Sequence, residues 1–328
     1  MKRYILLANR QKDIEFQYAD FFYEKDMELI FFNFSRLRIG LLKIIDILRL
    51  KNSKLNYILI FKYIFDKTIK HNLTYSADDE YVFIINARVY EKYGSFLVRY
   101  LRGNYASCKV VIYLTDLIHT MRFSMDDARR EFDVVCSFDK KEAEKNNLHF
   151  ILEPFSMRYI DRIPKIKKPQ FDVTFVGSAK NRYDLIVQIY KKLSAMGLKC
   201  DFYVVGVKKG DRRKVEGIHY RGLSFEDLLR HVANSKCVLE IMQDGGYSAT
   251  TRYAEAMLLN RNLLTDCPAL YDENEESIII LDDNTKLSKS QICTLHNETV
   301  ERFASKFSIR KFVQKINDCL HNVEGEKC

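Results

Sequence analysis

Short apolar runs that alternate with helix-length segments constrain the fold of this chain most strongly. A brief apolar run between turn signals is typical of a strand in a parallel sheet, because helices cover both faces of such a sheet. Repeated alternation of strand and helix favours the α/β class. The expected strands are 4–8, 28–34, 81–86, 110–114, 133–137, 171–177, 200–205, 217–220, 238–242, 262–265 and 277–281.

The length of 328 residues favours two domains, each with its own core. Three of the four prolines, Pro154, Pro164 and Pro169, lie close together, and proline disfavours both helix interiors and central strands. We therefore place the domain boundary in this stretch and predict two doubly wound α/β domains, 1–158 and 159–305. The clearest expected helices are 182–196, 224–233, 251–259 and 300–320.

Composition argues against several classes of protein. No uncharged apolar run is long enough for a transmembrane helix, and the apolar run at the N-terminus is too short for a signal peptide. The eight cysteines are widely spread without a C-x-x-C pair or a Cys/His cluster, so we expect no structural zinc. Cysteines inside apolar strands are usually small core residues, and this usage fits a reducing cytoplasm.

Positive charge is concentrated in residues 36–70, which hold nine Lys and Arg against two Asp and are also rich in Leu, Ile, Phe and Tyr. One interpretation is a basic amphipathic helix that contacts an anionic membrane surface. The other is a core helix with a solvated basic face. The net charge of +9 would also suit nucleic acid, but no recognisable nucleic-acid-binding motif accompanies it, so we expect no such partner.

Polar loops follow several expected strands of the second domain. Ligands of open parallel sheets lie outside the carboxyl ends of the strands, so these loops are the candidate binding sites. The strand at 171–177 leads into a small-residue turn with two cations, which suits a diphosphate. A glycine follows the next expected strand, 200–205. A tyrosine and an arginine lie at the end of the strand after it, 217–220, and they would either pack on a planar base or form a surface turn. These residues are Gly177, Ser178, Lys180 and Arg182, then Gly206, then Tyr220 and Arg221.

A strand, a loop and a helix follow one another within 238–267. The glycines Gly245 and Gly246 let the backbone approach a ligand closely. Thr250 or Thr251 can cap the helix that follows, and the free N–H groups of its first turn favour an anion. Arg252 and Glu255, three residues apart, share one face of this helix near its start. The segment therefore predicts a phosphate-bearing ligand.

Four sequence motifs of the second half occur in the order expected for one known type of domain. They are Val-Thr-Phe-Val-Gly-Ser at 173–178, Asp-Phe-Tyr-Val-Val-Gly at 201–206, Tyr-Arg-Gly-Leu-Ser-Phe-Glu-Asp at 220–227 and Gly-Gly-Tyr-Ser-Ala-Thr-Thr-Arg-Tyr-Ala-Glu-Ala at 245–256. Together they resemble the donor-binding domain of GT-B glycosyltransferases, in particular bacterial enzymes that build lipopolysaccharide and capsular polysaccharide. The first half is similar at the level of the fold, with some local likeness at 132–139.

The resemblance implies two Rossmann-like domains that face a cleft. Residues 159–305 would hold a nucleotide-sugar donor, and residues 1–158 would hold the acceptor. The C-terminal helix, in 306–328, would return to the first domain. By the same resemblance, Glu255 would accept hydrogen bonds from the donor ribose.

The resemblance also assigns Thr250, Thr251 and Arg252 to the donor phosphates. No Asp-x-Asp motif follows a convincing strand, so we expect neither a metal-bridged diphosphate nor a cofactor. Loop N–H groups, Lys180 and Arg252 could stabilise the leaving phosphate instead. Many retaining members carry two glutamates separated by seven residues, but Tyr247 stands at the first of these positions here. The stereochemical outcome, retaining or inverting, is therefore open.

An inverting transfer needs a carboxylate or an imidazole to take the proton of the acceptor hydroxyl. Asp116 directly follows the expected strand at 110–114 and is the first candidate for this catalytic role, and His119 is the second. The alternative for Asp116 is a helix cap, which is a common role for aspartate after a strand.

The sequence therefore predicts a cytoplasmic glycosyltransferase that moves a sugar from a nucleotide donor to a surface glycan or glycolipid. The basic segment 36–70 would hold it at the anionic inner face of the cell membrane. Two alternatives stay open. One is a non-catalytic GT-B-like subunit that binds a nucleotide or glycan, and the other is a sugar-nucleotide epimerase on the same fold.

Overall fold

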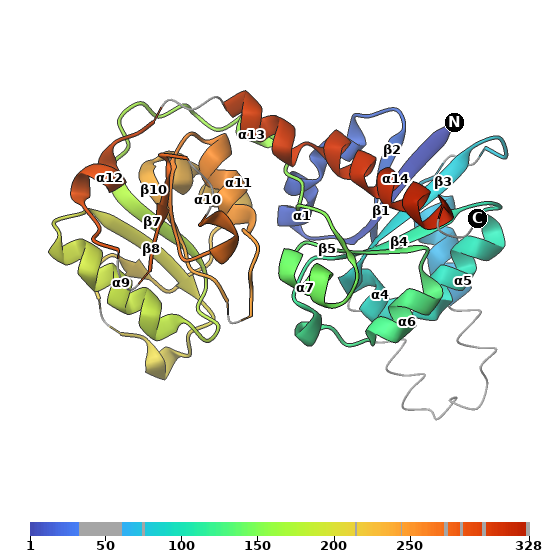
Figure 1. The fold of residues 1–328 in the computed structure, drawn as a ribbon, viewed down its shortest axis with the longest axis horizontal. Coiled ribbons are helices and arrows are strands. Elements are labelled where there is room, and N and C mark those ends of the chain that lie inside the picture. The colour runs from blue at the N-terminus through green and yellow to red at the C-terminus, as the bar shows by residue number, and fades with distance from the viewer. Residues whose placement is uncertain are drawn as a thin grey trace. The chain divides into compact units, whose positions relative to one another are not determined.

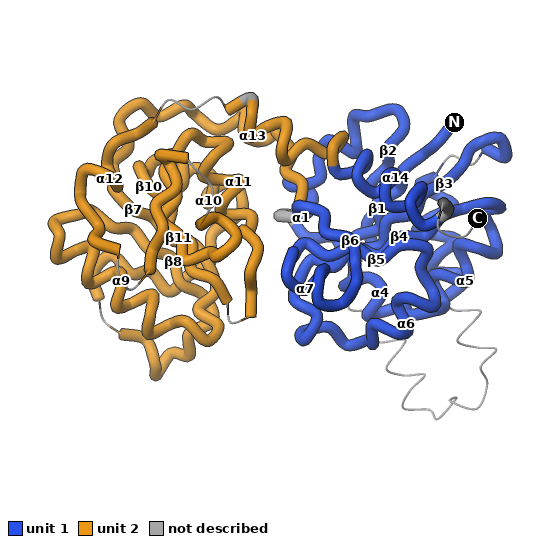
Figure 2. The backbone as a smooth tube through the Cα atoms, viewed as in Figure 1, with its two compact units in different colours: residues 1–152, 312–328 blue, residues 153–311 orange. Residues whose placement is uncertain are grey.

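The computed structural model describes residues 1–32, 61–73, 76–213, 215–243, 245–271, 275–282, 285–296 and 300–325. The chain forms two compact units, which we call unit 1 (residues 1–152 and 312–328) and unit 2 (residues 153–311) (Figure 2). The predicted divisions after residues 158 and 305 each fall six residues from the structural ones. Across the described ranges, no helix is long and apolar enough to cross a membrane.

Unit 1 contains a six-stranded parallel sheet in the order β2-β1-β3-β4-β5-β6 (Figure 1). The chain starts in the sheet with β1, adds β2 on one side and then continues with β3 on the other. Five of the strands were predicted, and the two-residue β6 was not. The strands are β1 (Lys2–Asn9), β2 (Met27–Phe32), β3 (Glu80–Asn86), β4 (Lys109–Leu114), β5 (Val134–Ser137) and β6 (His149–Phe150).

Helices cover both faces of this sheet, which explains why its strands are nearly continuous apolar runs. Alternate residues such as Ile5, Phe83 and Ile112 pack in one core cluster with α4 (Ala87–Tyr93), α5 (Ser95–Asn104) and α6 (Met125–Glu131). On the other face, the ring of Tyr113 meets the ring of Phe312 on the C-terminal helix α14 (Ile309–Gly325), with 5.0 Å between centroids. The shorter helices are α1 (Lys12–Gln17) and α7 (Lys140–Lys145).

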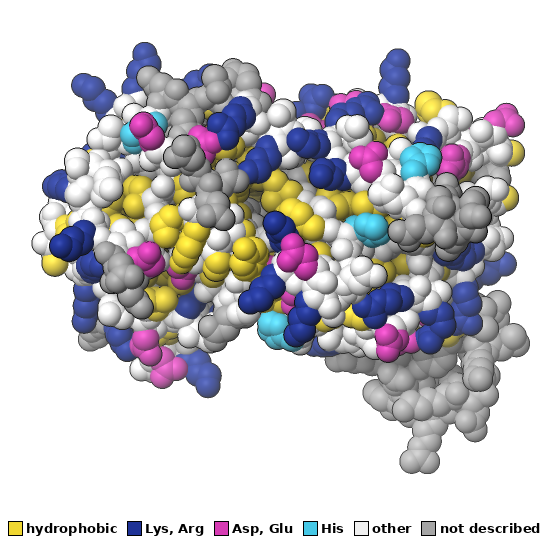
Figure 3. All heavy atoms as spheres, in the orientation of Figure 1, with side chains coloured by type: hydrophobic (Ala, Val, Ile, Leu, Met, Phe, Trp, Pro, Cys, Tyr) yellow, Lys and Arg dark blue, Asp and Glu magenta, His cyan; other side chains and the backbone are white. Residues whose placement is uncertain are grey.

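The predicted basic segment 36–70 is described only from residue 61. Residues 61–70 are helical, and Phe61, Phe65 and Ile69 are buried in the core cluster of unit 1. The basic side chains of this stretch, at Lys62, Lys67 and Lys70, are exposed, so the second interpretation of the segment holds for these ten residues. The membrane contact was predicted for the whole segment 36–70, and its residues 36–60 lie outside the described ranges. On the face shown in Figure 3, Lys and Arg are dispersed among acidic side chains and form no continuous stripe.

Unit 2 repeats the architecture with the strand order β12-β11-β10-β7-β8-β9, again parallel throughout. The chain starts with β7 and extends to β8 and β9, then returns to place β10 on the other side of β7. Its strands are β7 (Phe171–Ser178), β8 (Cys200–Val205), β9 (Ile218–His219), β10 (Ser235–Glu240), β11 (Asn262–Thr265) and β12 (Ile278–Ile280). Its helices are α8 (Met157–Ile160), α9 (Tyr183–Ala195), α10 (Phe225–Ala233), α11 (Thr251–Leu258), α12 (Lys289–Cys293) and α13 (Val300–Phe307).

Two predicted elements have different bounds in the structure. The strand predicted at 238–242 is β10, which ends at Glu240 because the N–H of Met242 donates to the carboxylate of Asp266 at 2.6 Å. The single helix predicted at 300–320 is two helices. The carbonyl of Phe307 accepts from Phe155 N, and the hydroxyl of Ser308 accepts from Lys311 N, which caps the new helix α14.

Candidate functional site

The carboxyl ends of β7 and β10 form the topological switch point of unit 2, because the chain leaves these neighbouring strands in opposite directions across the sheet. Ligands of open α/β sheets bind at such a point. Gly177 and Ser178 are the last residues of β7, so the strand extends one residue beyond its predicted end at Gly177 and the loop begins after Ser178. The guanidinium of Arg182 donates to the carbonyl of Ile241 after β10 and, at 3.4 Å, to that of Ser178. Arg182 therefore ties the two strand ends together.

A second arginine reaches the same strand end from helix α11. Thr250 is the N-cap of this helix, and its hydroxyl accepts from Arg252 N at 3.2 Å. Arg252 Nε donates to the carbonyl of Val176 in β7 at 3.0 Å, and its Nη1 pairs with the carboxylate of Glu255. The prediction that Arg252 and Glu255 share one face of the helix is therefore confirmed. Thr251 is the first residue of the helix.

Glu240, the last residue of β10, is a member of this site that was not singled out from the sequence. Its side chain is 2% exposed and accepts hydrogen bonds from Thr250 N at 3.0 Å, Thr250 Oγ1 at 2.6 Å and Thr265 Oγ1 at 2.7 Å. Burial raises the pKa of Glu240, and these hydrogen bonds oppose the shift. A charged residue within the apolar run 238–242 was the available signal, since a buried carboxyl group requires partners.

We call Arg182, Glu240, Arg252, Glu255 and Asp266 the switch-point network. Burial raises the pKa of each of its three carboxyl groups above the ordinary value. Burial also lowers the pKa of the Arg182 guanidinium. Nearby Asp266 and Glu240 oppose this shift, and Arg252 adds to it. Two arginines and three carboxyl groups thus share a poorly hydrated space beside the ends of β7 and β10. Electrostatic interactions are stronger in such a space than in water.

Two buried atoms of the network have unused hydrogen-bonding capacity. Among the described residues, Arg182 Nε and Glu255 Oε1 find no hydrogen-bond partner. An unpaired buried polar atom costs about 1–3 kcal/mol, and native structures contain few of them. One of these atoms is a donor and the other is an acceptor, and both residues interact with Arg252 and Glu240. A ligand that carries both an anionic oxygen and a hydroxyl group would satisfy the two together.

The turn after β7 extends this site. Lys180 has a left-handed backbone with φ 42°, and its ammonium donates to the side chain of Gln243 after β10. Gly206, after β8, has φ 81°, and a Cβ there would lie 3.1 Å from the hydroxyl of Ser178. A glycine is therefore needed for both backbone conformation and close approach. The structure places Gly177, Ser178, Lys180, Arg182 and Gly206 along adjacent strand ends.

The paired glycines lie in the loop between β10 and α11. Gly245 has φ 83°, which glycine adopts readily. Gly246 N donates to the carbonyl of Gln243 at 2.9 Å, and a Cβ on Gly246 would lie 3.1 Å from that oxygen. The loop is therefore tightly turned, and a side chain at Gly246 would crowd it.

Tyr220 and Arg221 lie by β9, two strands away from the switch point. The hydroxyls of Tyr220 and Tyr183 share a hydrogen bond of 2.7 Å, and Tyr220 also donates to the carbonyl of Arg213 at 2.6 Å. The guanidinium of Arg212 lies 5.5 Å from the centre of the Tyr220 ring, and that of Arg221 lies 5.6 Å from the Tyr203 ring. Burial raises the pKa of Tyr220 to about 12. Two alternatives were stated from the sequence for Tyr220 and Arg221, namely packing on a planar base and a surface turn. These contacts correspond to the surface turn.

Unit 1 contains the predicted catalytic residues after β4. Asp116 Oδ2 pairs with Arg88 at 2.7 Å, and Oδ1 accepts from Leu117 N at 3.1 Å. A carboxylate has about four acceptor sites, so each oxygen of Asp116 can still accept a further hydrogen bond. His119 is exposed on the following turn, Ile118–Thr120. Asp116 is therefore not a helix cap but part of an ion pair with Arg88.

Glu142, on α7, supports this turn and was not anticipated. Its carboxylate accepts from Ile118 N at 3.1 and 2.9 Å. Burial raises the pKa of Glu142, and the nearby Asp139 and Asp116 add to the rise, whereas the Ile118 N–H and His119 lower it.

Unit 1 has its own switch point between β1 and β3. There, within the described residues, the buried Asn9 Oδ1 finds no hydrogen-bond partner.

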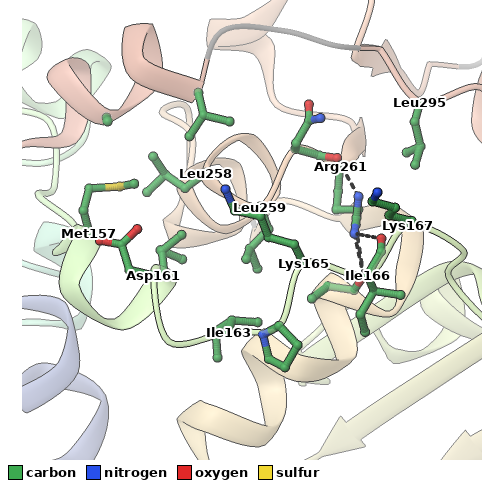
Figure 4. Close-up of a pocket in the computed structure, with 16 residues that line it drawn as sticks. Met157, Asp161, Ile163, Lys165, Ile166, Lys167, Leu258, Leu259, Arg261 and Leu295 are labelled. Atoms are coloured by element: carbon green, nitrogen blue, oxygen red, sulfur yellow. Dashed lines mark hydrogen bonds between the residues drawn. The ribbon is translucent and has the colours of Figure 1, made fainter.

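A cavity of about 790 Å³ lies elsewhere in unit 2, beside α8, the end of α11 and the start of α13 (Figure 4). Its walls are mainly aliphatic, with Lys165 and Lys167 among the lining residues. Arg261 also lines it, but its guanidinium donates to the carbonyls of Ala233, Asn260 and Ile166. Arg261 is therefore structural, and the cavity contains none of the predicted site residues.

Within the ranges that the structure describes, no group of three or more His, Cys, Asp or Glu side chains is placed to hold a metal ion.

Two doubly wound parallel sheets of six strands, in consecutive units of one chain, define the GT-B fold of glycosyltransferases. Solved structures are similar over almost the whole chain. An alpha-glucosyltransferase in complex with UDP has a TM-score of 0.54 and 13% identity, covering 98% of this chain and 95% of that chain. An alpha-glucosyltransferase in complex with UDP-glucose and DNA containing an abasic site has a TM-score of 0.50 and 12% identity, with the same coverages. A UDP-forming trehalose-phosphate synthase from Burkholderia xenovorans has a TM-score of 0.48 and 10% identity, covering 99% and 100%.

The two alpha-glucosyltransferase structures, with TM-scores of 0.54 and 0.50, support the fold. No family model matches the chain, and no curated protein matches it in sequence.

Proposed function

We propose that the protein is a glycosyltransferase whose unit 2 binds a nucleotide-sugar donor at the switch-point network and whose unit 1 binds the acceptor. The observation that carries this proposal is the pair of unsatisfied buried atoms, Arg182 Nε and Glu255 Oε1, at the switch point of a GT-B fold. A nucleotide sugar offers what the pair lacks, namely anionic phosphate oxygens and ribose hydroxyl groups.

The phosphates are the natural partners of the cationic side of the site. Arg182 Nε is as buried as Glu255 Oε1, so it would donate to a phosphate oxygen once the surrounding residues have moved, and charge-assisted hydrogen bonds of this kind are about twice as strong as neutral ones. Thr250 and Thr251 begin α11, whose first N–H groups favour negative charge. Lys180 can leave Gln243 and add a further positive charge. These groups would stabilise the diphosphate as it leaves, without a metal ion.

The ribose is the proposed partner of Glu255. Its carboxylate is 0% exposed, so a ribose hydroxyl can reach Oε1 only if neighbouring residues move. We propose that the loop between β10 and α11 makes this movement, because Gly245 in that loop has a φ of 83° and its backbone is conformationally permissive. Donor binding is therefore expected to be coupled to a rearrangement of this loop.

The transfer requires a group that accepts the proton of the acceptor hydroxyl. We propose Asp116 for this role, with His119 as the second candidate and Glu142 as the residue that anchors their turn through Ile118 N–H. As the proton moves to Asp116, the acceptor oxygen bonds to the anomeric carbon and the bond from that carbon to the diphosphate oxygen breaks. This assignment corresponds to an inverting reaction.

The proposed acceptor is a surface glycan or glycolipid at the inner face of a cell membrane, as in the synthesis of lipopolysaccharide or capsule. The basic residues of 36–60 are the proposed contact with anionic lipid. An oligonucleotide duplex should be included among the test acceptors, because an alpha-glucosyltransferase of similar fold has been solved with DNA.

Turnover assays distinguish an enzyme from the two alternatives. The protein is incubated with UDP-, GDP-, ADP- and CMP-sugars, with and without lipid-linked and soluble glycan acceptors. A glycosyltransferase releases nucleotide faster with its acceptor and yields a larger glycan. An epimerase converts the donor sugar without acceptor. A binding subunit is stabilised by nucleotide without any turnover, and this outcome would overturn the proposed activity.

A further inference from the structure

Three side chains lie side by side on one face of the sheet in unit 1. Tyr113 of β4 is the register partner of Cys136 in β5, and Cys136 is the register partner of His149 in β6. Directly paired residues of neighbouring strands project to the same face. Since the ring of Tyr113 packs on Phe312 of α14, this face is the one that α14 covers.

Helical periodicity brings Cys319 onto the same contact. Phe312, Ile316 and Leu320 are buried and recur every four residues, which defines the face of α14 that packs on the sheet. Cys319 is three residues after Ile316 and therefore lies at the edge of that face, where it is half-buried. The Cys136 thiol and the His149 imidazole are the neighbouring groups with the largest effect on the pKa of its thiol. Cys136 itself is fully buried.

The same contacts make the two thiols chemically unequal. The neighbouring Cys136 thiol and then the His149 imidazole lower the pKa of Cys319 to about 5, although burial opposes the shift. Burial holds the pKa of Cys136 well above its ordinary value. At neutral pH the nucleophilic thiolate is therefore on the more accessible sulfur, next to a protonated thiol.

We propose that Cys319 and Cys136 form a peroxide-reactive thiol pair that closes to a disulfide between α14 and β5. The Cys319 thiolate attacks one oxygen of a hydroperoxide, whose O–O bond breaks and releases an alcohol or water, and Cys319 becomes a sulfenic acid. The Cys136 sulfur then attacks the Cys319 sulfur, and the S–O bond breaks to release water. Two thiols are oxidised by two electrons, and the hydroperoxide is reduced by two.

The expected consequence is a covalent attachment of α14 to the sheet of unit 1. Hydrogen bonds from Lys2 and Tyr4 to Asn317, at 2.7 and 3.3 Å, already hold this helix against the sheet. A cytoplasmic disulfide is ordinarily transient, because cellular thiols reduce it. The pair would therefore act as a reversible lock that is independent of the proposed sugar transfer.

The experiment compares the two half-buried cysteines of the described chain. Cys293 is the internal control, because burial and Asp172 raise its pKa. The measurements use the full chain with Cys328→Ser, so that the last thiol does not contribute. At pH 7, iodoacetamide should modify Cys319 roughly tenfold or more faster than Cys293, as judged by peptide mass spectrometry. After one equivalent of hydrogen peroxide, the intact protein should lose the mass of two hydrogen atoms and yield a Cys136–Cys319 linked peptide.

Single variants separate the two steps. Cys319→Ser should abolish the loss of mass, and Cys136→Ser should leave a sulfenic acid on Cys319 that dimedone captures. Cys293→Ser should behave as the parent. The proposal is overturned if Cys293 is alkylated as fast as Cys319, if peroxide links other cysteines, or if Cys136→Ser gives no dimedone adduct. Circular dichroism of each variant establishes that it is folded.

Discussion

Replacement of Glu240 by alanine tests whether the switch-point network is the structural centre of unit 2. Glu240→Ala leaves three donors without their acceptor, namely the buried Thr265 Oγ1 and the half-buried Thr250 N and Thr250 Oγ1. Each unpaired buried donor costs about 1–3 kcal/mol, and some will find water or a neighbouring carbonyl. We therefore expect a loss of roughly 3–6 kcal/mol in the free energy of unfolding. For a domain of this size that loss corresponds to a fall in Tm of roughly 6–24 °C.

The assay is urea unfolding followed by circular dichroism, together with calorimetry to separate the transitions of the two units. Glu240→Gln retains the shape and one acceptor oxygen, and Thr265 can reverse its hydroxyl to accept from the new amide, so this variant should cost only about 1 kcal/mol. Glu226→Ala is the matched control, because Glu226 lies half-exposed on α10 in an ion pair with Arg230, and such pairs contribute about 0–1 kcal/mol.

The reasoning fails if Glu240→Ala costs no more than Glu226→Ala, because the three hydrogen bonds would then carry no net stability. It also fails if Glu240→Gln is as destabilising as Glu240→Ala. In that case the charge or the precise size of the side chain would matter, and the satisfaction of donors would not.

Three further predictions concern pH, the backbone and the chemistry. Burial raises the pKa of Glu240 in the folded protein, so protonation of this carboxyl group stabilises the fold. That stability is fully present below the pKa of Glu240 in the unfolded chain and is lost as pH rises through its pKa in the folded protein. The Tm of the wild type should therefore rise relative to that of Glu240→Gln as the pH is lowered from 8 to 5. Gly206→Ala should cost about 1–2 kcal/mol in urea unfolding because φ is 81°, whereas Gly210→Ala, with open space around its Cβ, should be nearly neutral. Asp116→Asn should slow sugar transfer by about 10²–10⁴-fold without weakening donor binding, and unchanged turnover would exclude Asp116 as the base.

The fold was predictable because central strands such as β3, β4 and β7 are buried on both faces and several helices begin at a capping residue. Ser224 and Thr250 are helix caps in the structure, as their residue types and positions indicated. The bounds of β10 were less predictable, since they depend on Asp266, which takes the N–H of Met242 from a distance of 24 residues in the chain. The break at Ser308 similarly depends on a hydrogen bond from Phe155, far away in sequence.

The site was predictable only in part. The strand-end rule brought Ser178, at the end of β7, and Gly206, after β8, to one place, because adjacent parallel strands end at the same edge. It could not show that Arg182 would bind the carbonyl of Ile241, 59 residues away, or that Glu240 would hold the cap of α11. These contacts arise from how loops fold back on the sheet, and loop conformation leaves little periodic signal in a sequence.

Nucleotide binding by the intact protein tests the central claim most directly. Isothermal titration of UDP, GDP, ADP and CMP into the wild type should detect binding of at least one nucleotide. Arg182→Ala should weaken that binding by roughly tenfold or more, corresponding to at least about 1.4 kcal/mol. Arg213→Ala, which removes an exposed arginine paired with Asp184, should leave it unchanged. If the folded wild type binds none of these nucleotides, or if Arg182→Ala binds as tightly as Arg213→Ala, the switch-point network is not the donor site.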